Sequence, residues 1–254
     1  MAKATIAVIN QKGGVGKTTT VINLAAYLAK AGRRVLVCDI DPQGNSTSGL
    51  GLDKQNINPT LYDVLFGRAG LAESIQTTSS SGVYLIPSNG NLAAAEVELV
   101  GTDHRELKLR QALAGLDYDY IIIDCPPSLG LLSINGLAAA SDALIPVQTE
   151  YYAMEGLSQL LATIQKVQQA LNPDLNLLGI VLTMYDRRTS LAEHVETEVK
   201  NHFGTKVFST VIPRNVRLAE APSFGRSIAE HDKWSKGARA YKALAKELEK
   251  RIIG

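Results

Sequence analysis

Residues 10–20 read Asn-Gln-Lys-Gly-Gly-Val-Gly-Lys-Thr-Thr-Thr, and this stretch decides the fold. Glycines at positions 13, 14 and 16 let the backbone approach a polyanion without obstruction by Cβ atoms, and their N–H groups can point at its oxygens. An apolar run at 5–9 precedes the loop, and apolar side chains recur at helical spacing through 17–31. The loop is therefore predicted to join a buried strand to a helix N-terminus, the setting of a phosphate-binding loop.

Side chains of the loop add chemistry to its backbone. Lys17 offers a positive charge to phosphates, and Thr18 offers a hydroxyl to Mg²⁺, which prefers hard oxygen ligands. The plain phosphate-loop pattern has glycine where this chain has Gln11, and a second lysine, Lys12, lies inside the loop. Lys12 is too close to the start of the loop to fold back easily onto phosphates bound there, so we expect it to serve a neighbouring molecule. A glycine-rich turn with incidental basic residues is the alternative.

Carboxylates close two further apolar runs. Asp39 and Asp41 stand at the end of one run, and the alternation of strand side chains sends both to the same side. Ligands of open α/β sheets lie at the carboxyl ends of the strands, so both acids can face the phosphates. Asp124 ends the other run just before two prolines, where a carboxylate can hold Mg²⁺ directly or through a water molecule. For Asp39 and Asp41, a capped turn with solvated acids is the alternative.

Strand-like and helix-like segments alternate along the chain. The predicted strands are 5–9, 33–40, 83–86, 120–124, 143–147, 177–184 and 207–212, and the predicted helices are 17–31, 60–66, 91–99, 103–113, 154–171 and 236–253. This order predicts an α/β fold with a mostly parallel, twisted sheet covered by helices on both faces. No linker rich in proline, glycine or serine interrupts it, so residues 1–254 are expected to form a single domain.

Composition narrows the possible functions. Cys38 and Cys125 are far apart and lack the spacing of a zinc site or a disulfide framework, and the four histidines share no metal-ligand spacing. No apolar stretch approaches the length that spans a bilayer, so a cytoplasmic protein is expected. Residues 181–254 contain 14 Lys or Arg and 9 Asp or Glu, a net charge of +5 that suggests a polyanionic partner or simply a solvated surface. Trp234 is expected to be anchored in the core, with a partner surface as the alternative.

Taken together, the three motifs resemble those of ParA/MinD-type ATPases with a deviant Walker A motif, and more narrowly those of chromosomal ParA (Soj) proteins. The motifs are residues 12–18, 39–45 and 123–127, and residues 146–153 and 211–222 add support. The resemblance runs essentially from end to end of the chain. It implies an enzyme that hydrolyses ATP with Mg²⁺ and a P-loop fold of the ParA/MinD type.

The resemblance also implies roles for particular residues. Lys12, Lys17 and Asp41 would be catalytic, with Lys12 reaching the phosphates held by the other subunit of a nucleotide-sandwich homodimer. Thr18, Asp39 and Asp124 would serve the metal. The implied nucleotide-binding residues are Gln11, Lys12, Gly13, Gly14, Val15, Gly16, Lys17, Thr18, Thr19, Met184, Pro213 and Asn215.

Partners follow from the same resemblance. The ATP-bound dimer would bind double-stranded DNA without sequence preference, associate with the nucleoid, and be stimulated by a ParB-type centromere-binding protein. The implied DNA-binding residues are Arg188, Arg217, Lys233, Lys236 and Arg239. The resulting function is an ATP-driven chromosome-partitioning switch.

Two other functions remain as alternatives. A MinD-like division-site ATPase that cycles on membranes needs a C-terminal amphipathic helix with a basic face, but Glu247 and Glu249 dilute that face here. A core-packed helix and no stable membrane association are therefore expected. A relative acting on a metabolite or an iron cluster would need exposed, paired cysteines, a pattern that Cys38 and Cys125 do not fit.

Overall fold

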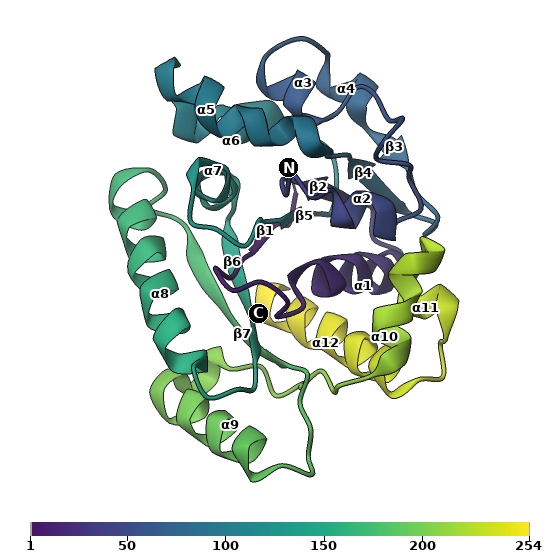
Figure 1. Ribbon diagram of the computed structural model, residues 1–254, viewed down its shortest axis with the longest axis vertical. Coiled ribbons are helices and arrows are strands. Elements are labelled where there is room, and N and C mark those ends of the chain that lie inside the picture. The colour runs from purple at the N-terminus through teal and green to yellow at the C-terminus, as the bar shows by residue number, and fades with distance from the viewer. Residues whose placement is uncertain (1, 254) are drawn as a thin grey trace.

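A computed structural model describes residues 2–253 and contains a seven-stranded sheet (Figure 1). The strand order is β3-β4-β2-β5-β1-β6-β7, and only the β3–β4 pairing is antiparallel. The strands are β1 Ala4–Val8, β2 Val35–Asp39, β3 Gln76–Thr77, β4 Val83–Ile86, β5 Tyr120–Asp124, β6 Asp142–Gln148 and β7 Asn176–Thr183. The predicted mostly parallel sheet is confirmed.

Helices connect the strands and cover both faces of the sheet. They are α1 Lys17–Lys30, α2 Asn45–Gly49, α3 Leu61–Leu65, α4 Leu71–Ser74, α5 Ala95–Glu98, α6 Lys108–Leu113, α7 Leu131–Ala139, α8 Ala153–Ala170, α9 Ser190–Phe203, α10 Val216–Glu220, α11 Ile228–His231 and α12 Lys236–Ile253. Figure 1 shows α1 and α12 packed side by side on one face, while α6, α7 and α8 lie on the other.

The hydrophobic core has two halves because strand side chains alternate between the faces. In β1, Ile6 and Val8 pack with α1 and α12, whereas Ala7 and the next residue after the strand, Ile9, pack with α7 and α8. All four side chains are fully buried. Burial on both faces explains why the strands read as continuous apolar runs in the sequence.

Three central strands place the functional motifs next to one another. β2, β5 and β1 are consecutive in the sheet, and their register sets Asp39 level with Asp124, and Asp124 level with Val8. The chain leaves all three strands at the same edge of the sheet. The glycine loop after β1 and both acid-bearing segments therefore meet there.

The strand predicted at 207–212 is wrong. This segment forms only isolated bridges, in which Val207 pairs with Ile180 and Pro213 with Tyr185. The Glu247 carboxylate on α12 accepts hydrogen bonds from the backbone N–H groups of Ser209, at 2.7 Å, and Thr210, at 2.9 Å. Because Glu247 takes these two N–H groups, they are not available for hydrogen bonds to a neighbouring strand. The apolar segment therefore does not form a regular strand.

Short helices were the least well predicted elements. The predicted helix 91–99 is a 3₁₀ turn followed by α5, and 103–113 is a 3₁₀ turn followed by α6. The helices that were not predicted are α2, α4, α7, α9, α10 and α11. Among the longer helices, α1, α8 and α12 match the predicted ranges to within one residue at each end.

Trp234 corrects another expectation, because its side chain is 77% exposed instead of anchored in the core. It lies in the turn between α11 and α12, where the chain is fixed through its backbone and the indole ring meets solvent. Within residues 2–253, no helix combines the length and apolar character needed to cross a bilayer.

Candidate nucleotide-binding site

The glycine loop forms an open cradle at the N-terminus of α1. Gly14 and Gly16 adopt φ values of 76° and 89°, in the left-handed region that side chains disfavour, and Gly16 is the N-cap of α1. A Cβ atom placed on Gly13 or Gly14 would meet no protein atom within 4 Å. The backbone of the loop therefore faces free space, and the orphan N–H groups of the helix point toward it.

Lys17 lies deep in this cradle and is only 6% exposed. Its Nζ donates a hydrogen bond to the carbonyl oxygen of Lys12 at 3.0 Å. Burial lowers the pKa of Lys17, and the nearby Asp124 and Asp41 carboxylates oppose that shift. A buried ammonium group whose hydrogen-bond partner is a backbone carbonyl of the loop can exchange that partner for an anion.

Lys12 and Gln11 contact the segment after β6. The Lys12 ammonium forms an ion pair with the Glu150 carboxylate, and the lysine side chain is 49% exposed. The Gln11 amide donates hydrogen bonds to the Gly156 carbonyl at 3.2 Å and to Gln159 at 3.0 Å. The Gln11 side chain is thus turned toward α8, while Lys12 lies at the outer side of the loop.

Asp124 presents an unsatisfied carboxylate oxygen beside the cradle. Its Oδ2 accepts a hydrogen bond from the Ser46 hydroxyl at 2.7 Å, whereas Oδ1 is buried and has no hydrogen-bond partner among residues 2–253. Burial raises the pKa of Asp124, and the Ser46 and Thr18 hydroxyls oppose that rise. A buried acceptor without a donor is costly, so this oxygen is suited to a bound cation or to a water molecule of its hydration shell. Within the same residues, no cluster of three or more His, Cys, Asp or Glu side chains could hold a metal unaided.

Asp39 and Asp41 shape the turn that follows β2. Asp39 is fully buried, and its carboxylate accepts hydrogen bonds from the Asp41 N–H at 3.2 Å and from the N–H and hydroxyl of Thr47 at 2.8 and 2.7 Å. Burial and the neighbouring Asp124 raise the pKa of Asp39. Asp41 is 6% exposed, and one of its carboxylate oxygens accepts the Gln43 N–H at 2.9 Å. Asp39 therefore positions the turn, and Asp41 is the acid nearer the surface.

A second cavity, of about 340 Å³, adjoins the loop. Gly16 and Thr19 of the loop and helix form one side, and Met184, Pro213 and Asn215 lie around it. The lining is mostly apolar, as suits a flat aromatic base. The remaining lining residues are Thr183, Ile212, Arg214, Val216, Leu218, Ala219 and Tyr241. Met184 and the pair Pro213 and Asn215, which come from two separate segments and were expected at a base site, thus meet in one cavity.

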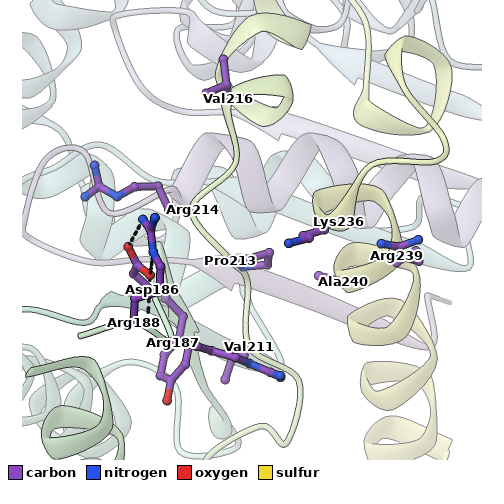
Figure 2. Close-up of a pocket in the computed structure, with 11 residues that line it drawn as sticks. Asp186, Arg187, Arg188, Val211, Pro213, Arg214, Val216, Lys236, Arg239 and Ala240 are labelled. Atoms are coloured by element: carbon purple, nitrogen blue, oxygen red, sulfur yellow. Dashed lines mark hydrogen bonds and ion pairs between the residues drawn. The ribbon is translucent and has the colours of Figure 1, made fainter. Parts of the chain in front are cut away.

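A wide cleft of about 860 Å³ lies next to this cavity and is strongly basic (Figure 2). Figure 2 shows Arg188 and Arg214 on one side, Lys236 and Arg239 of α12 on the other, and Pro213 between them. Arg187 and Arg214 were not among the predicted residues, because an arginine in a loop has no sequence signal for where it points. Both belong to this cleft.

The predicted DNA-binding residues fall into two groups. Arg188, Lys236 and Arg239 line the cleft, whereas Arg217 and Lys233 lie outside it. Carboxylates neutralise part of this charge. Asp186 pairs with Arg188 at 2.7 Å, and Glu220 pairs with Arg217 at 2.9 Å.

The sheet, the glycine loop and the strand-end acids define a P-loop ATPase. A family model described as an AAA domain matches residues 3–177. "Chromosome partitioning protein ParA" of Myxococcus xanthus is 55% identical over 248 residues, covering 97% of this chain and 88% of that protein. "Sporulation initiation inhibitor protein Soj" of Bacillus subtilis is 56% identical over 245 residues, covering 96% and 97%. The chain belongs to the ParA/Soj family of chromosome-partitioning ATPases.

Solved structures agree on the fold. A Mycobacterium smegmatis structure, described as cobyrinic acid a,c-diamide synthase with bound ADP and magnesium, is 42% identical with a TM-score of 0.88, covering 98% of this chain and 95% of that one. The septum site-determining protein MinD from Pyrococcus horikoshii, complexed with Mg-ADP, is 29% identical with a TM-score of 0.80, covering 97% and 96%. The P-loop fold of the ParA/MinD type is thereby confirmed.

Proposed function

We propose that this chromosome-partitioning ATPase works as a switch in which Mg-ATP drives formation of a sandwich homodimer, the dimer binds DNA without sequence preference, and hydrolysis releases it. The observation that carries the proposal is the open glycine cradle with buried Lys17 and the unpaired Asp124 oxygen at its edge. Relatives crystallised with ADP or an ATP analogue and magnesium support ATP and Mg²⁺ as the cofactors.

The residues of the cradle divide the work of phosphoryl transfer to water. The N–H groups of residues 13–19 hold the phosphates, and Lys17 exchanges the Lys12 carbonyl for phosphate oxygens. The Thr18 hydroxyl and the Asp124 carboxylate would hold Mg²⁺, directly or through water, and the chemistry that the ion would supply is neutralisation of phosphate charge. Asp41 orients the attacking water, while Asp39 holds the Asp41 turn in place. The base lies against Met184, Pro213 and Asn215.

Dimerisation explains the role of Lys12, the second lysine of the glycine loop. Lys12 is half exposed and paired with Glu150, so its ammonium lies away from the phosphates of its own loop. In the dimer it exchanges this partner for the phosphates of the facing subunit. A cation supplied from a second molecule stabilises charge in the transition state, as an arginine finger does. Hydrolysis would then require the dimer.

DNA binding rests on the basic cleft. Arg188, Lys236 and Arg239 line it together with Arg187 and Arg214, and Asp186 is the acid that faces them. A dimer presents two such clefts and roughly doubles the phosphate contacts, which steepens the dependence of binding on salt. This activity would place the protein on the nucleoid, where a ParB-type centromere-binding partner would stimulate hydrolysis.

A MinD-like membrane cycle gains no support from α12. Tyr241, Leu244 and Leu248 of this helix are buried against α1 and the sheet, so its apolar side is already covered. An interfacial helix needs that side for the lipid.

Two variants test the switch by size measurement with and without ATP. Asp41→Ala should bind ATP, fail to hydrolyse it and accumulate as a dimer, because only the orientation of water is lost. Gly13→Val should stay monomeric, because the added bulk fills the space into which phosphates and the facing subunit must come. Gly13 has no positive φ and open space at its Cβ, so the valine should leave the fold intact, as circular dichroism would check. A Gly13→Val dimer with ATP, or a monomeric Asp41→Ala with ATP, would contradict the proposal.

A further inference from the structure

Trp234 is a large aromatic side chain that projects from a rigid backbone. Its indole is 77% exposed, and it is the single tryptophan of the chain. The Trp234 N–H donates to the Asp232 carboxylate at 3.1 Å, and the Ser235 hydroxyl caps α12 by accepting the Ala238 N–H at 3.1 Å. The indole ring therefore does not contribute to the hydrophobic core, and the turn holds the backbone of Trp234 in place.

One cation lies against this ring, and others are nearby in the chain. The Lys233 ammonium lies 5.2 Å from the centre of the indole, and Lys236 follows at the start of α12. The Asp232 carboxylate that anchors the Trp234 backbone also lies 3.8 Å from the Arg217 guanidinium. Trp234 thus lies in a turn between Lys233 and Lys236, and Lys236 lines the basic cleft.

Basic side chains beside an exposed aromatic ring suit the binding of nucleic acid that has unpaired bases. Lysine and arginine neutralise phosphates, and an indole stacks on any base because every base has a π-face. A stacked base inside a perfect duplex is covered by its neighbours, so the ring gains most from an unpaired or unstacked base.

We propose that Trp234 stacks on unpaired bases of DNA bound along the basic cleft, so that the protein prefers gapped or single-stranded DNA over perfect duplex. This inference rests on the proposed DNA binding and adds base contact to what is otherwise phosphate contact. The stacking is tolerant of sequence. It distinguishes nucleic acid from polyanions that have no bases.

The fluorescence of the single tryptophan reports stacking directly. ATP-loaded protein is titrated with a duplex, with the same duplex carrying a short single-stranded gap, and with heparin, which has charge but no bases. Gapped DNA should quench the fluorescence strongly, and heparin should leave it nearly unchanged. Equal quenching by heparin and gapped DNA would overturn the proposal.

Affinity measurements with variants complete the test. Trp234→Ala should lose about tenfold in affinity for gapped DNA and little for perfect duplex, whereas Trp234→Tyr should keep the preference. Phe224→Ala is the matched control, because Phe224 is 64% exposed but its ring stacks on His231. An undiminished preference for gapped DNA in Trp234→Ala overturns the inference.

DNA binding and base stacking are distinguished by different outcomes. If Arg239→Glu abolishes duplex binding while Trp234→Ala retains the gap preference, DNA binding stands and stacking is wrong. If the ATP-loaded protein binds no form of DNA, both are wrong.

Discussion

At the scale of single residues, the site is defined by polar groups of two kinds. Some have no hydrogen-bond partner in the described chain, and others have a partner that a ligand can replace. Lys17 donates to a backbone carbonyl of its own loop, and Lys12 pairs with Glu150. Both partners are replaceable by phosphate oxygens. The buried Oδ1 of Asp124 has no donor within the described chain. These features favour a ligand that brings both negative charge and a cation.

Replacing Asp124 by asparagine tests the assigned metal role. Asp124→Asn should shift the Mg²⁺ concentration needed for tight ADP binding upward by about 10–100-fold, because a carboxylate that holds the ion or its water is lost. ADP binding without Mg²⁺ should not weaken, since a negative charge near the phosphates is removed. Calorimetric titrations of ADP at increasing Mg²⁺ measure both. Ser46→Ala, which removes only the donor to Asp124, is the control and should shift the midpoint less. An unchanged midpoint in Asp124→Asn would exclude the assigned role.

At the scale of elements, α12 determines the structure of the segment at Ser209 and Thr210, which precede Glu247 by 38 and 37 positions. Glu247 receives the backbone N–H groups of Ser209 and Thr210, and its side chain is 18% exposed. The Arg251 guanidinium lies 3.8 Å from the centre of the Phe208 ring and 3.1 Å from Glu247. This helix therefore fixes the approach to Pro213, the residue shared by the base cavity and the basic cleft.

Glu247 gives α12 a pH-dependent contribution to stability. Burial raises the pKa of Glu247, but the N–H donors of Ser209 and Thr210 outweigh it and hold the pKa below its ordinary value of 4.5. A pKa lowered in the folded state stabilises the protein above pH 4.5, and this contribution is lost as pH falls through the folded value. Glu247→Gln should lower the free energy of unfolding by about 1–3 kcal/mol at pH 7.

Urea unfolding at pH 7 and pH 4 measures this difference. The gap between the parent and Glu247→Gln should narrow at the lower pH. Glu198→Gln is the control, since Glu198 is exposed and forms no ion pair with the rest of the described chain, and it should change stability little at either pH. A gap that widens at pH 4 would show that the carboxylate charge is not what stabilises the segment.

At the scale of the whole molecule, one sheet links the two halves of the core. The four central strands of the sheet, β2, β5, β1 and β6, each contribute side chains to the hydrophobic clusters on both faces. If the helices on either face detached, they would expose the same strands to solvent. We therefore expect the chain to behave as a single domain.

Thermal unfolding tests this expectation. Scanning calorimetry without nucleotide should give one transition whose calorimetric and van't Hoff enthalpies agree. Mg-ADP should raise the midpoint because it binds only the folded state. The signals from far-ultraviolet circular dichroism and from Trp234 fluorescence should change together. Two separate transitions without nucleotide would show two independently folding units.

The sequence alone determined the sheet, the glycine loop and the positions of the strand-end acids. These are local properties of the sequence. Apolar runs indicate buried strands, and glycines indicate where the backbone can adopt conformations that other residues disfavour. A polar residue directly after a buried strand indicates the edge of the sheet where ligands bind. The ParA/Soj family was recognisable from the same stretches. Six of the seven predicted strands were right for this reason.

Only the tertiary structure decided which distant groups meet. It paired Lys12 with Glu150, turned Gln11 toward α8, gathered Arg187 and Arg214 into the basic cleft, and left Trp234 in solvent. The lost strand at 207–212 has the same origin. Periodicity shows that a segment is buried, but the partner that takes its backbone N–H groups, here Glu247, is set by packing across the chain.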